Sequence, residues 1–146
     1  MVATLGNHDH DVAEPVNTVQ SQIIIDYLQN MGIKVLNNDA FFWNEKQIYV
    51  VGIDDNDLGY HDLKRAYQKV DLSKPQILLA HSPDIMQNLW NQLFSPNLVL
   101  SGHTHCGQIR LPFLGAIPGI IPTSMGKMLE RHYYRFIDTD IFITCG

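Results

Sequence analysis

The stretch Asn-Leu-Val-Leu-Ser-Gly-His-Thr-His-Cys-Gly-Gln, residues 97 to 108, joins an apolar run to a turn that carries two histidines. The run 97–100 predicts a buried strand, and Gly102 allows the backbone of the turn to approach a ligand closely. His103 and His105 lie one residue apart on this turn, so both imidazoles could face one pocket. Histidine is the commonest metal-binding side chain. The pair suggests a metal site, although a single His-x-His is weak support because surface loops contain many by chance.

Two other predicted strands end in the same way. Residues 2–5 lead into Gly-Asn-His-Asp at 6–9, and residues 77–80 lead into His81. In open α/β sheets, ligands bind at the carboxyl ends of the strands. Each ending also has a purely structural interpretation: a capped turn at 7–9, the start of a helix after His81, and a surface loop at 103–105. Three such endings in one chain favour a common site at this edge of the sheet.

Length and composition are those of one globular domain. With 146 residues the chain is long enough to bury a core of its own, and 45% hydrophobic and 17% charged residues are ordinary proportions. A net charge of −5 without a basic stripe disfavours a nucleic-acid partner. Small phosphorylated ligands stay compatible with this charge, because metal ions rather than arginines could neutralise them.

Cysteine usage and hydropathy bear on location. Cys106 and Cys145 are the two cysteines; they provide no framework of several disulfides and suit a reducing compartment, although a bridge between the two stays open. No run of about 18 apolar residues predicts a membrane span. The N-terminus lacks a charged region followed by an apolar stretch, so no signal peptide is predicted. These features are compatible with a cytoplasmic location or peripheral attachment to a membrane.

The periodicity of apolar residues predicts alternating strands and helices, and therefore an α/β fold with mixed sheets. The first helix begins near Pro15, ends at Gly32, and has Val19, Ile23, Tyr27 and Met31 at four-residue spacing on one face. Two further helices are expected at 61–70 and 83–94. Strands are expected at 2–5, 34–36, 41–43, 47–53, 77–80, 97–100, 108–111, 133–137 and 141–144, and an irregular loop at 112–126.

These motifs, in this order, resemble the calcineurin-like metallophosphoesterase superfamily, and in particular its bacterial branch of YkuE- and YaeI-like phosphodiesterases. The branch has the motifs Gly-Asn-His-Asp, Gly-x-Asp-Asp, Leu-x-His-x-Pro-Asp and Gly-His-Thr-His-Gly-Gln-x-x-x-Pro. This chain matches them at 6–9, 52–55, 79–84 and 102–112, with Cys106 where the family usually has glycine. Cys106 would then need a backbone angle that glycine adopts more cheaply. The resemblance covers essentially the whole chain.

The resemblance implies a four-layer α/β/β/α sandwich with mixed sheets and a phosphodiesterase or phosphatase site. Two divalent metal ions (Mn, Zn, Fe or Mg) about 3.5–4 Å apart would bind a hydroxide and clamp the phosphoryl group of a small-molecule or lipid-like substrate. The metal ligands implied are Asn7, His81 and His103 for one ion and His105 for the other. His8 would stabilise the phosphate and protonate the leaving alkoxide, with Asp9 as its orienting partner or as a turn-capping residue.

Two family motifs have no counterpart in this chain. Asp-x-His and Gly-Asp-x-x-Asp precede Gly-Asn-His-Asp in the family, and only five residues precede Gly6 here. We therefore expect 1–146 to be a single, incomplete phosphoesterase domain that lacks the first βαβ unit and carries the later half of the site. His105 would be the only remaining protein ligand of the second metal. The alternatives are a catalytically inactive metal-binding remnant or one part of a split enzyme. An exposed sheet edge would favour self-association or a complementary upstream polypeptide.

Residues outside the family ligand set receive structural interpretations. The acidic turn after the strand 47–53 is expected to be solvated rather than to replace the missing carboxylates. Asp84 is expected to cap or charge the first turn of its helix. The remaining histidines are expected at the surface. The residues concerned are Asp54, Asp55 and Asp57 in the turn, and His10, His61 and His132.

Overall fold

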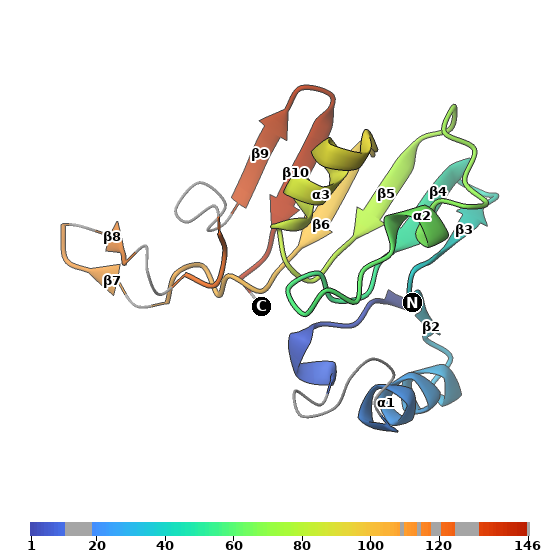
Figure 1. Cartoon of the computed structure of the whole chain (residues 1–146), viewed down its shortest axis with the longest axis horizontal. Helices are drawn as coiled ribbons and strands as arrows, with labels where there is room; N and C mark the ends of the chain where they lie inside the picture. Colours follow the sequence, from blue (N-terminus) through green and yellow to red (C-terminus); the bar gives the residue numbers. More distant parts are fainter. Residues whose placement is uncertain (11–18, 109, 114, 118–120, 125–131, 146) are drawn as a thin grey trace.

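The computed structural model describes residues 1–10, 19–108, 110–113, 115–117, 121–124 and 132–145. Its main body is a six-stranded sheet with the strand order β3-β4-β5-β6-β10-β9 (Figure 1). The four central strands are parallel, and the edge strands β3 and β9 are antiparallel to their neighbours. The expected α/β class with a mixed sheet is confirmed. The strands are β3 (Asp39–Trp43), β4 (Ile48–Gly52), β5 (Gln76–Leu79), β6 (Leu98–Ser101), β10 (Thr139–Ile143) and β9 (His132–Phe136).

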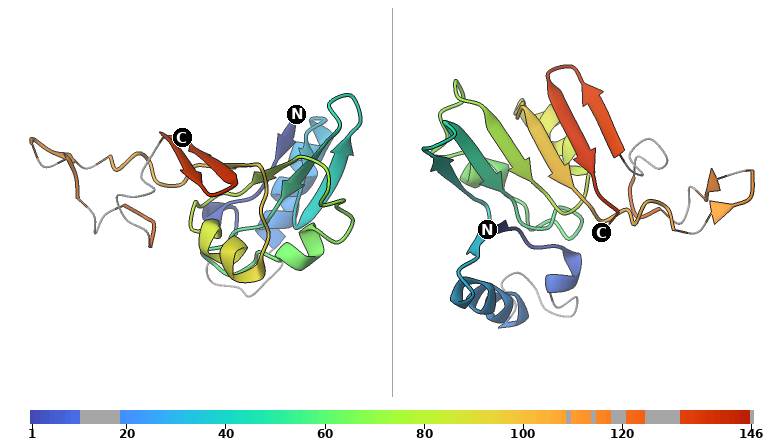
Figure 2. Two further views of the ribbon diagram at one scale, coloured as in Figure 1. Left: turned by 90° about the horizontal axis from the view of Figure 1, so that it is seen from above. Right: turned by 180° about the vertical axis from the view of Figure 1, so that it is seen from behind.

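Two short helices cover one face of this sheet. Both α2 (Leu63–Ala66) and α3 (Ile85–Gln92) lie on the same side, as Figure 2 shows. Alternate residues of the central strands point toward them, and together they form the main core. Parallel strands are usually buried on both faces, so this arrangement accounts for only half of the expected covering. The core includes Val51, Leu78, Val99 and Ile141 from the strands, and Leu63, Ile85, Met86 and Leu89 from the helices.

The opposite face of the six-stranded sheet is also apolar. Its side chains border a shallow hollow of about 470 Å³, and no described helix crosses this face when the sheet is seen from behind (Figure 2). The bordering residues are Met1, Val2, Phe41, Trp43, Val50, Ile77, Leu79 and Leu100. We call this surface the bare sheet face.

A smaller unit lies beside the main sheet. Its strands β1 (Val2–Ala3) and β2 (Lys34–Val35) are parallel, a short 3₁₀ helix η1 (Asn7–Asp9) follows β1, and α1 (Val19–Asn30) precedes β2. Within the described residues β1 pairs with β2 alone, which leaves its other edge open. The expected apolar face of α1 is present but unpacked. Its residues are 60–78% exposed: Val19, Ile23, Tyr27 and Met31.

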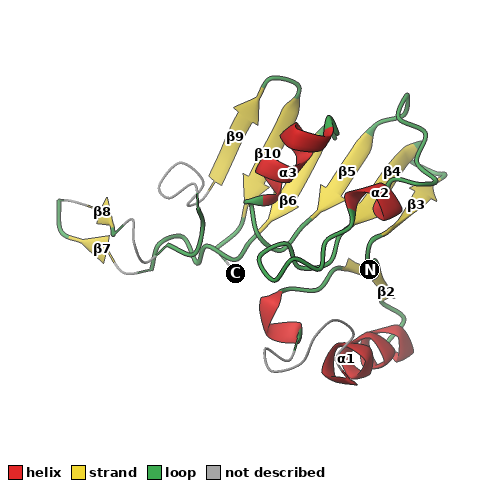
Figure 3. Cartoon of the chain, in the orientation of Figure 1, coloured by secondary structure: helices red, strands yellow, loops and turns green. Residues whose placement is uncertain are grey.

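Several sequence-based boundaries were wrong. The expected helix at 61–70 is limited to α2 (Figure 3). The expected strands at 34–36 and 41–43 are present as β2 and β3, and they belong to different sheets. Asn38, with a φ of 51°, turns the chain between these two strands, as expected for the segment 37–39. The segment 112–126 is not wholly irregular, since β8 (Gly115–Ala116) pairs with β7 (Arg110–Leu111) in a hairpin that projects from the main body (Figure 1). The helix start expected at Pro15 lies outside the described residues.

The expected four-layer sandwich is therefore not confirmed. The described residues form one six-stranded sheet with helices on one face, together with the small β1–β2 unit and the β7–β8 hairpin. None of the described helices combines the length and apolar character needed to cross a membrane.

Candidate functional site

The predicted turns meet at the carboxyl ends of the parallel strands. His81 follows β5, Gly102 follows β6, and the backbone N–H of Gly102 donates a 3.0 Å hydrogen bond to the carbonyl of His81. Gly6 packs directly on the imidazole of His81. A Cβ on Gly6 would lie 2.6 Å from Cγ and from Nδ1 of that ring, so glycine is required for this close approach. The Gly-Asn-His-Asp turn and the β5 turn are thus neighbours.

Two of the predicted metal ligands are in direct contact. Nδ1 of His103 lies 2.9 Å from Nε2 of His81, and the two rings are tilted by 60° with centroids 4.7 Å apart. Burial and the neighbouring His103 lower the pKa of His81, which favours the neutral imidazole that binds metals. Asn7 directly follows Gly6, and its Oδ1 is buried without a hydrogen-bond partner in the described part of the chain.

His105 is placed differently from the other predicted ligands. Its side chain is exposed and borders a separate hollow of about 160 Å³ with Gln108, Ile121 and Pro122. Across the described residues, no group of three or more histidine, cysteine, aspartate or glutamate side chains has an arrangement that could hold a metal ion. The structure therefore brings His81 and His103 together, and it does not add His105 to them.

The histidine turn has an unusual backbone. Non-glycine residues rarely adopt positive φ, yet three of the four residues from His103 to Cys106 do so: His103, His105 and Cys106 have φ values of 65°, 48° and 53°. The expectation that Cys106 adopts a backbone angle suited to glycine is confirmed. Thr104, between the two histidines, is wholly buried, and its hydroxyl accepts a 3.3 Å hydrogen bond from the backbone N–H of Cys106.

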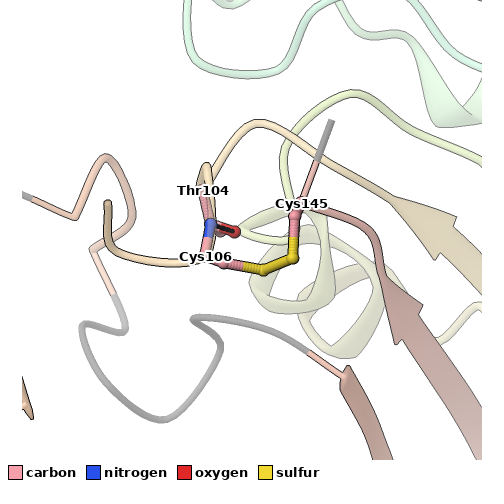
Figure 4. Close-up of a disulfide and its surroundings, with 3 residues drawn as sticks. All are labelled: Thr104, Cys106 and Cys145. Carbon is pink, nitrogen blue, oxygen red and sulfur yellow. Dashed lines mark hydrogen bonds between the residues drawn. A yellow bond between two sulfur atoms is a disulfide. The ribbon is translucent and has the colours of Figure 1, made fainter.

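A disulfide fixes this turn to the end of β10. Cys106 and Cys145 are bonded, with their Cα atoms 4.9 Å apart and a separation of 39 positions in the sequence (Figure 4). The sequence left this bridge open and favoured a reducing compartment. Disulfides persist in oxidising environments and are rare in the cytosol. The bridge therefore weighs against the compartment that the cysteine count suggested.

The acidic loop after β4 was misread from the sequence. Asp54 and Asp55 are buried rather than solvated, and burial raises the pKa of Asp55. Asp57 is more exposed, but its Oδ2 lies 2.9 Å from Nε2 of His103. This hydrogen bond holds the pKa of His103 above its ordinary value. It also lowers the pKa of Asp57, against the opposing effect of partial burial. The sequence signal for this contact was the position of the acidic residues directly after a predicted strand, as for His81. In the structure β4 and β5 are parallel neighbours, so the residues that follow them meet at one edge of the sheet.

His10 was also wrongly assigned to the surface. It is 5% exposed, and its Nε2 lies 2.7 Å from Oδ1 of Asp54, with its ring against Tyr60. This pair links the N-terminal turn to the loop after β4. His61 is partly buried, with a buried Nδ1 that has no hydrogen-bond partner among the described residues. His132 is exposed on β9, as expected.

The remaining predicted residues have clear local partners. Asp9 accepts a 2.8 Å hydrogen bond from the backbone N–H of Gly6, which is the turn-capping interaction considered from the sequence. The side chain of His8 is exposed. Asp84 was expected to cap or charge the first turn of α3; it occupies the N-cap position, but its side chain makes no capping hydrogen bond. Its carboxylate instead accepts hydrogen bonds from the hydroxyl of Thr123 and, at 2.6 Å, from the backbone N–H of Ser124.

Comparison with known proteins identifies the family of the chain. The chain is 34% identical to the phosphodiesterase YaeI of Escherichia coli over 77% of its length and 39% of that protein. It is 35% identical to the metallophosphoesterase YkuE of Bacillus subtilis over 68% of its length and 33% of that protein. It is 36% identical to an uncharacterised metallophosphoesterase of Helicobacter pylori over 97% of its length and 35% of that protein.

The chain belongs to the calcineurin-like metallophosphoesterases, in the branch that includes YaeI and YkuE. It spans about a third to two fifths of the length of these relatives. No protein-family profile matches the chain. No solved structure matches it either.

Proposed function

We propose that the chain is part of a metal-dependent phosphoester hydrolase, a phosphodiesterase or phosphatase that acts on a phosphorylated small-molecule or lipid-like substrate. The observation that carries this proposal is the contact between His81 and His103, which joins the ends of β5 and β6 beside the Gly6–Asn7 turn. The names of the relatives, phosphodiesterase and metallophosphoesterase, support the same reaction class.

The donor atoms at this position fit a divalent metal ion. Oδ1 of Asn7 is buried without a partner in the described region, and two ring nitrogens approach within 2.9 Å. Imidazole suits zinc, manganese and iron, and an amide oxygen suits the harder cations. Asn7, His81 and His103 would hold one ion, and His105 would contribute to a second position. When bound, such ions supply a hydroxide at neutral pH and neutralise charge on the phosphoryl oxygens.

His8 and Asp9 have complementary roles in this proposal. His8 is exposed on η1, directly after Asn7, and in this proposal its imidazole would stabilise the phosphoester and protonate the leaving alkoxide. Asp9 acts as a positioning residue, because its carboxylate accepts the backbone N–H of Gly6 and so holds the turn that carries Asn7 and His8.

A catalytically inactive metal-binding remnant, or one part of a split enzyme, is the second candidate. It is favoured by the separate position of His105 and by the lack, within the described residues, of a cluster of three or more ligating side chains. Both candidates need the same first metal position and differ in whether this polypeptide alone hydrolyses a phosphoester.

Calorimetric titration with Mn²⁺ tests the metal position. We expect the wild-type chain to bind Mn²⁺, and His103→Ala to abolish the heat of binding, because this variant removes one of the two facing ring nitrogens. The matched control is His132→Ala, which removes an exposed histidine on β9 and should leave the titration unchanged. A wild-type chain that binds neither Mn²⁺ nor Zn²⁺ contradicts the proposal.

A hydrolysis assay distinguishes the two candidate functions. Hydrolysis of a chromogenic phosphodiester by the chain alone, abolished by His8→Ala, would exclude the inactive remnant.

The two unpacked apolar surfaces lead to a prediction about assembly. The bare sheet face and the apolar face of α1 are both unpacked, and within the described residues one edge of β1 is unpaired, so a complementary polypeptide or a second copy of the chain would bury these surfaces. We expect light scattering after size exclusion to give a mass above the 16.6 kDa of one chain. Trp43→Lys on the bare sheet face should lower that mass, and Gln68→Lys on an exposed polar site should not. A folded wild-type monomer contradicts this expectation.

A further inference from the structure

A chain of hydrogen bonds runs through the histidine pair. The hydroxyl of Ser82 hydrogen-bonds the carboxylate of Asp57, and Oδ2 of Asp57 lies 2.9 Å from Nε2 of His103. On the other side of the same ring, Nδ1 of His103 lies 2.9 Å from Nε2 of His81. Asp57 and His81 therefore contact opposite nitrogens of one imidazole. No family motif quoted above includes Asp57.

This arrangement determines which nitrogen of His103 carries the proton in the neutral ring. An ionised carboxylate can only accept hydrogen bonds, so Nε2 of His103 must carry the hydrogen that Asp57 accepts. A neutral imidazole has a single N–H, which leaves Nδ1 as an unprotonated lone pair. That lone pair is directed at Nε2 of His81.

We propose that Asp57 is a positioning residue that holds His103 in the Nε2–H tautomer and reserves its Nδ1 for a divalent cation shared with His81. The inference rests on the metal position described under Proposed function. Metal-binding histidines commonly donate their other ring N–H to a carboxylate, which fixes the tautomer and the ring orientation and raises the basicity of the ligand. Asp57 has this relation to His103 and lies on the side of the ring that faces away from His81.

The loop that carries Asp57 is rigidly held. Oδ1 of Asp55 accepts a 2.7 Å hydrogen bond from the backbone N–H of Leu58, and the carbonyl of Asp55 accepts the backbone N–H groups of Tyr60 and His61. Asp54, one residue earlier, is fixed by the buried contact with His10. The loop that carries Asp57 is therefore held in place by hydrogen bonds other than the one to His103. A carboxylate that orients a metal ligand needs this kind of support.

Imidazole nitrogen NMR tests the tautomer directly and without metal. In EDTA, at a pH where both rings are neutral, long-range ¹⁵N–¹H correlations should show His103 of the wild-type chain as the Nε2–H form. Asp57→Ala should lose this preference, and Asp57→Glu, which restores a carboxylate, should recover it at least in part. The control is Asp140→Ala, which removes a carboxylate bonded to Tyr133 at the far end of β10 and should leave the His103 spectrum unchanged.

Metal affinity gives the second readout. Asp57→Ala should weaken Mn²⁺ binding by about 10- to 100-fold, the usual effect of losing such an outer carboxylate, and Asp140→Ala should not change it. The proposal is overturned if Asp57→Ala keeps the Nε2–H tautomer, or if it binds Mn²⁺ within twofold of the wild-type affinity. If the wild-type chain binds no Mn²⁺, the cation part of the proposal is refuted together with the metal position, and the tautomer experiment alone then shows whether Asp57 orients the ring.

Discussion

Gly52→Ala is expected to lower the free energy of unfolding by about 3 kcal/mol, the upper end of the range for overpacking a core. A Cβ at this position would lie 2.3 Å from Cβ of Leu36 and 2.8 Å from the carbonyl oxygen of Leu36. Neither partner can move freely, because Gly52 pairs with Asp39 and Leu79 in the sheet. Leu36 is wholly buried, and its backbone N–H donates to the carbonyl of Ala3. Urea denaturation followed by circular dichroism measures the change.

Gly102→Ala is the matched control for that variant. Its Cβ would meet only Oγ1 of Thr144, at an ordinary 3.4 Å, and its φ lies outside the left-handed region. We expect a change within about 0.5 kcal/mol, or a slight gain from the lower entropy of the unfolded chain. Equal destabilisation by the two substitutions would contradict the interpretation that the close contact of Gly52 with Leu36 leaves no room for a Cβ.

The close approach at Gly52 could not be anticipated from local sequence. The glycine was visible only as part of the Gly-x-Asp-Asp motif, and its role depends on Leu36, which lies 16 residues earlier in the sequence. The strands themselves could be anticipated, because apolar runs such as 77–80 and 97–100 lead into turns that carry histidine. In the structure these two strands pair in parallel. Apolar pattern determines where a strand lies, but contacts between separate units depend on the fold.

The candidate site also has one contact that local sequence predicts and one that depends on the fold. The contact of His81 with His103 follows from two strand endings on neighbouring parallel strands, so it could be predicted from the sequence. The role of Asp57 could not, because three carboxylates in a short turn usually indicate a solvated loop. Only the direction of the loop after β4 decides that Asp57 reaches His103 while Asp54 bonds to His10.

Reduction of the Cys106–Cys145 disulfide is expected to lower the free energy of unfolding by about 3 to 4 kcal/mol, as chain-entropy arguments give for a loop of this length. For a domain of this size the midpoint of thermal unfolding should fall by about 10 °C. The exposed position of Cys145 makes the bridge accessible to a thiol reductant. The bridge also holds a turn in which His103, His105 and Cys106 all have positive φ, so the reduced turn is free to relax toward commoner backbone angles.

Calorimetry of the wild-type chain with and without reductant measures this effect, and Cys145→Ser provides the control. The variant should unfold at the temperature of the reduced wild-type chain and should not respond to reductant, because it has no bridge to lose. If the wild-type midpoint is unchanged by complete reduction, the bridge does not stabilise the fold. In that case the close approach of the turn to the end of β10 must be maintained by other contacts, such as the 2.8 Å backbone hydrogen bond from Thr144 to Ser101.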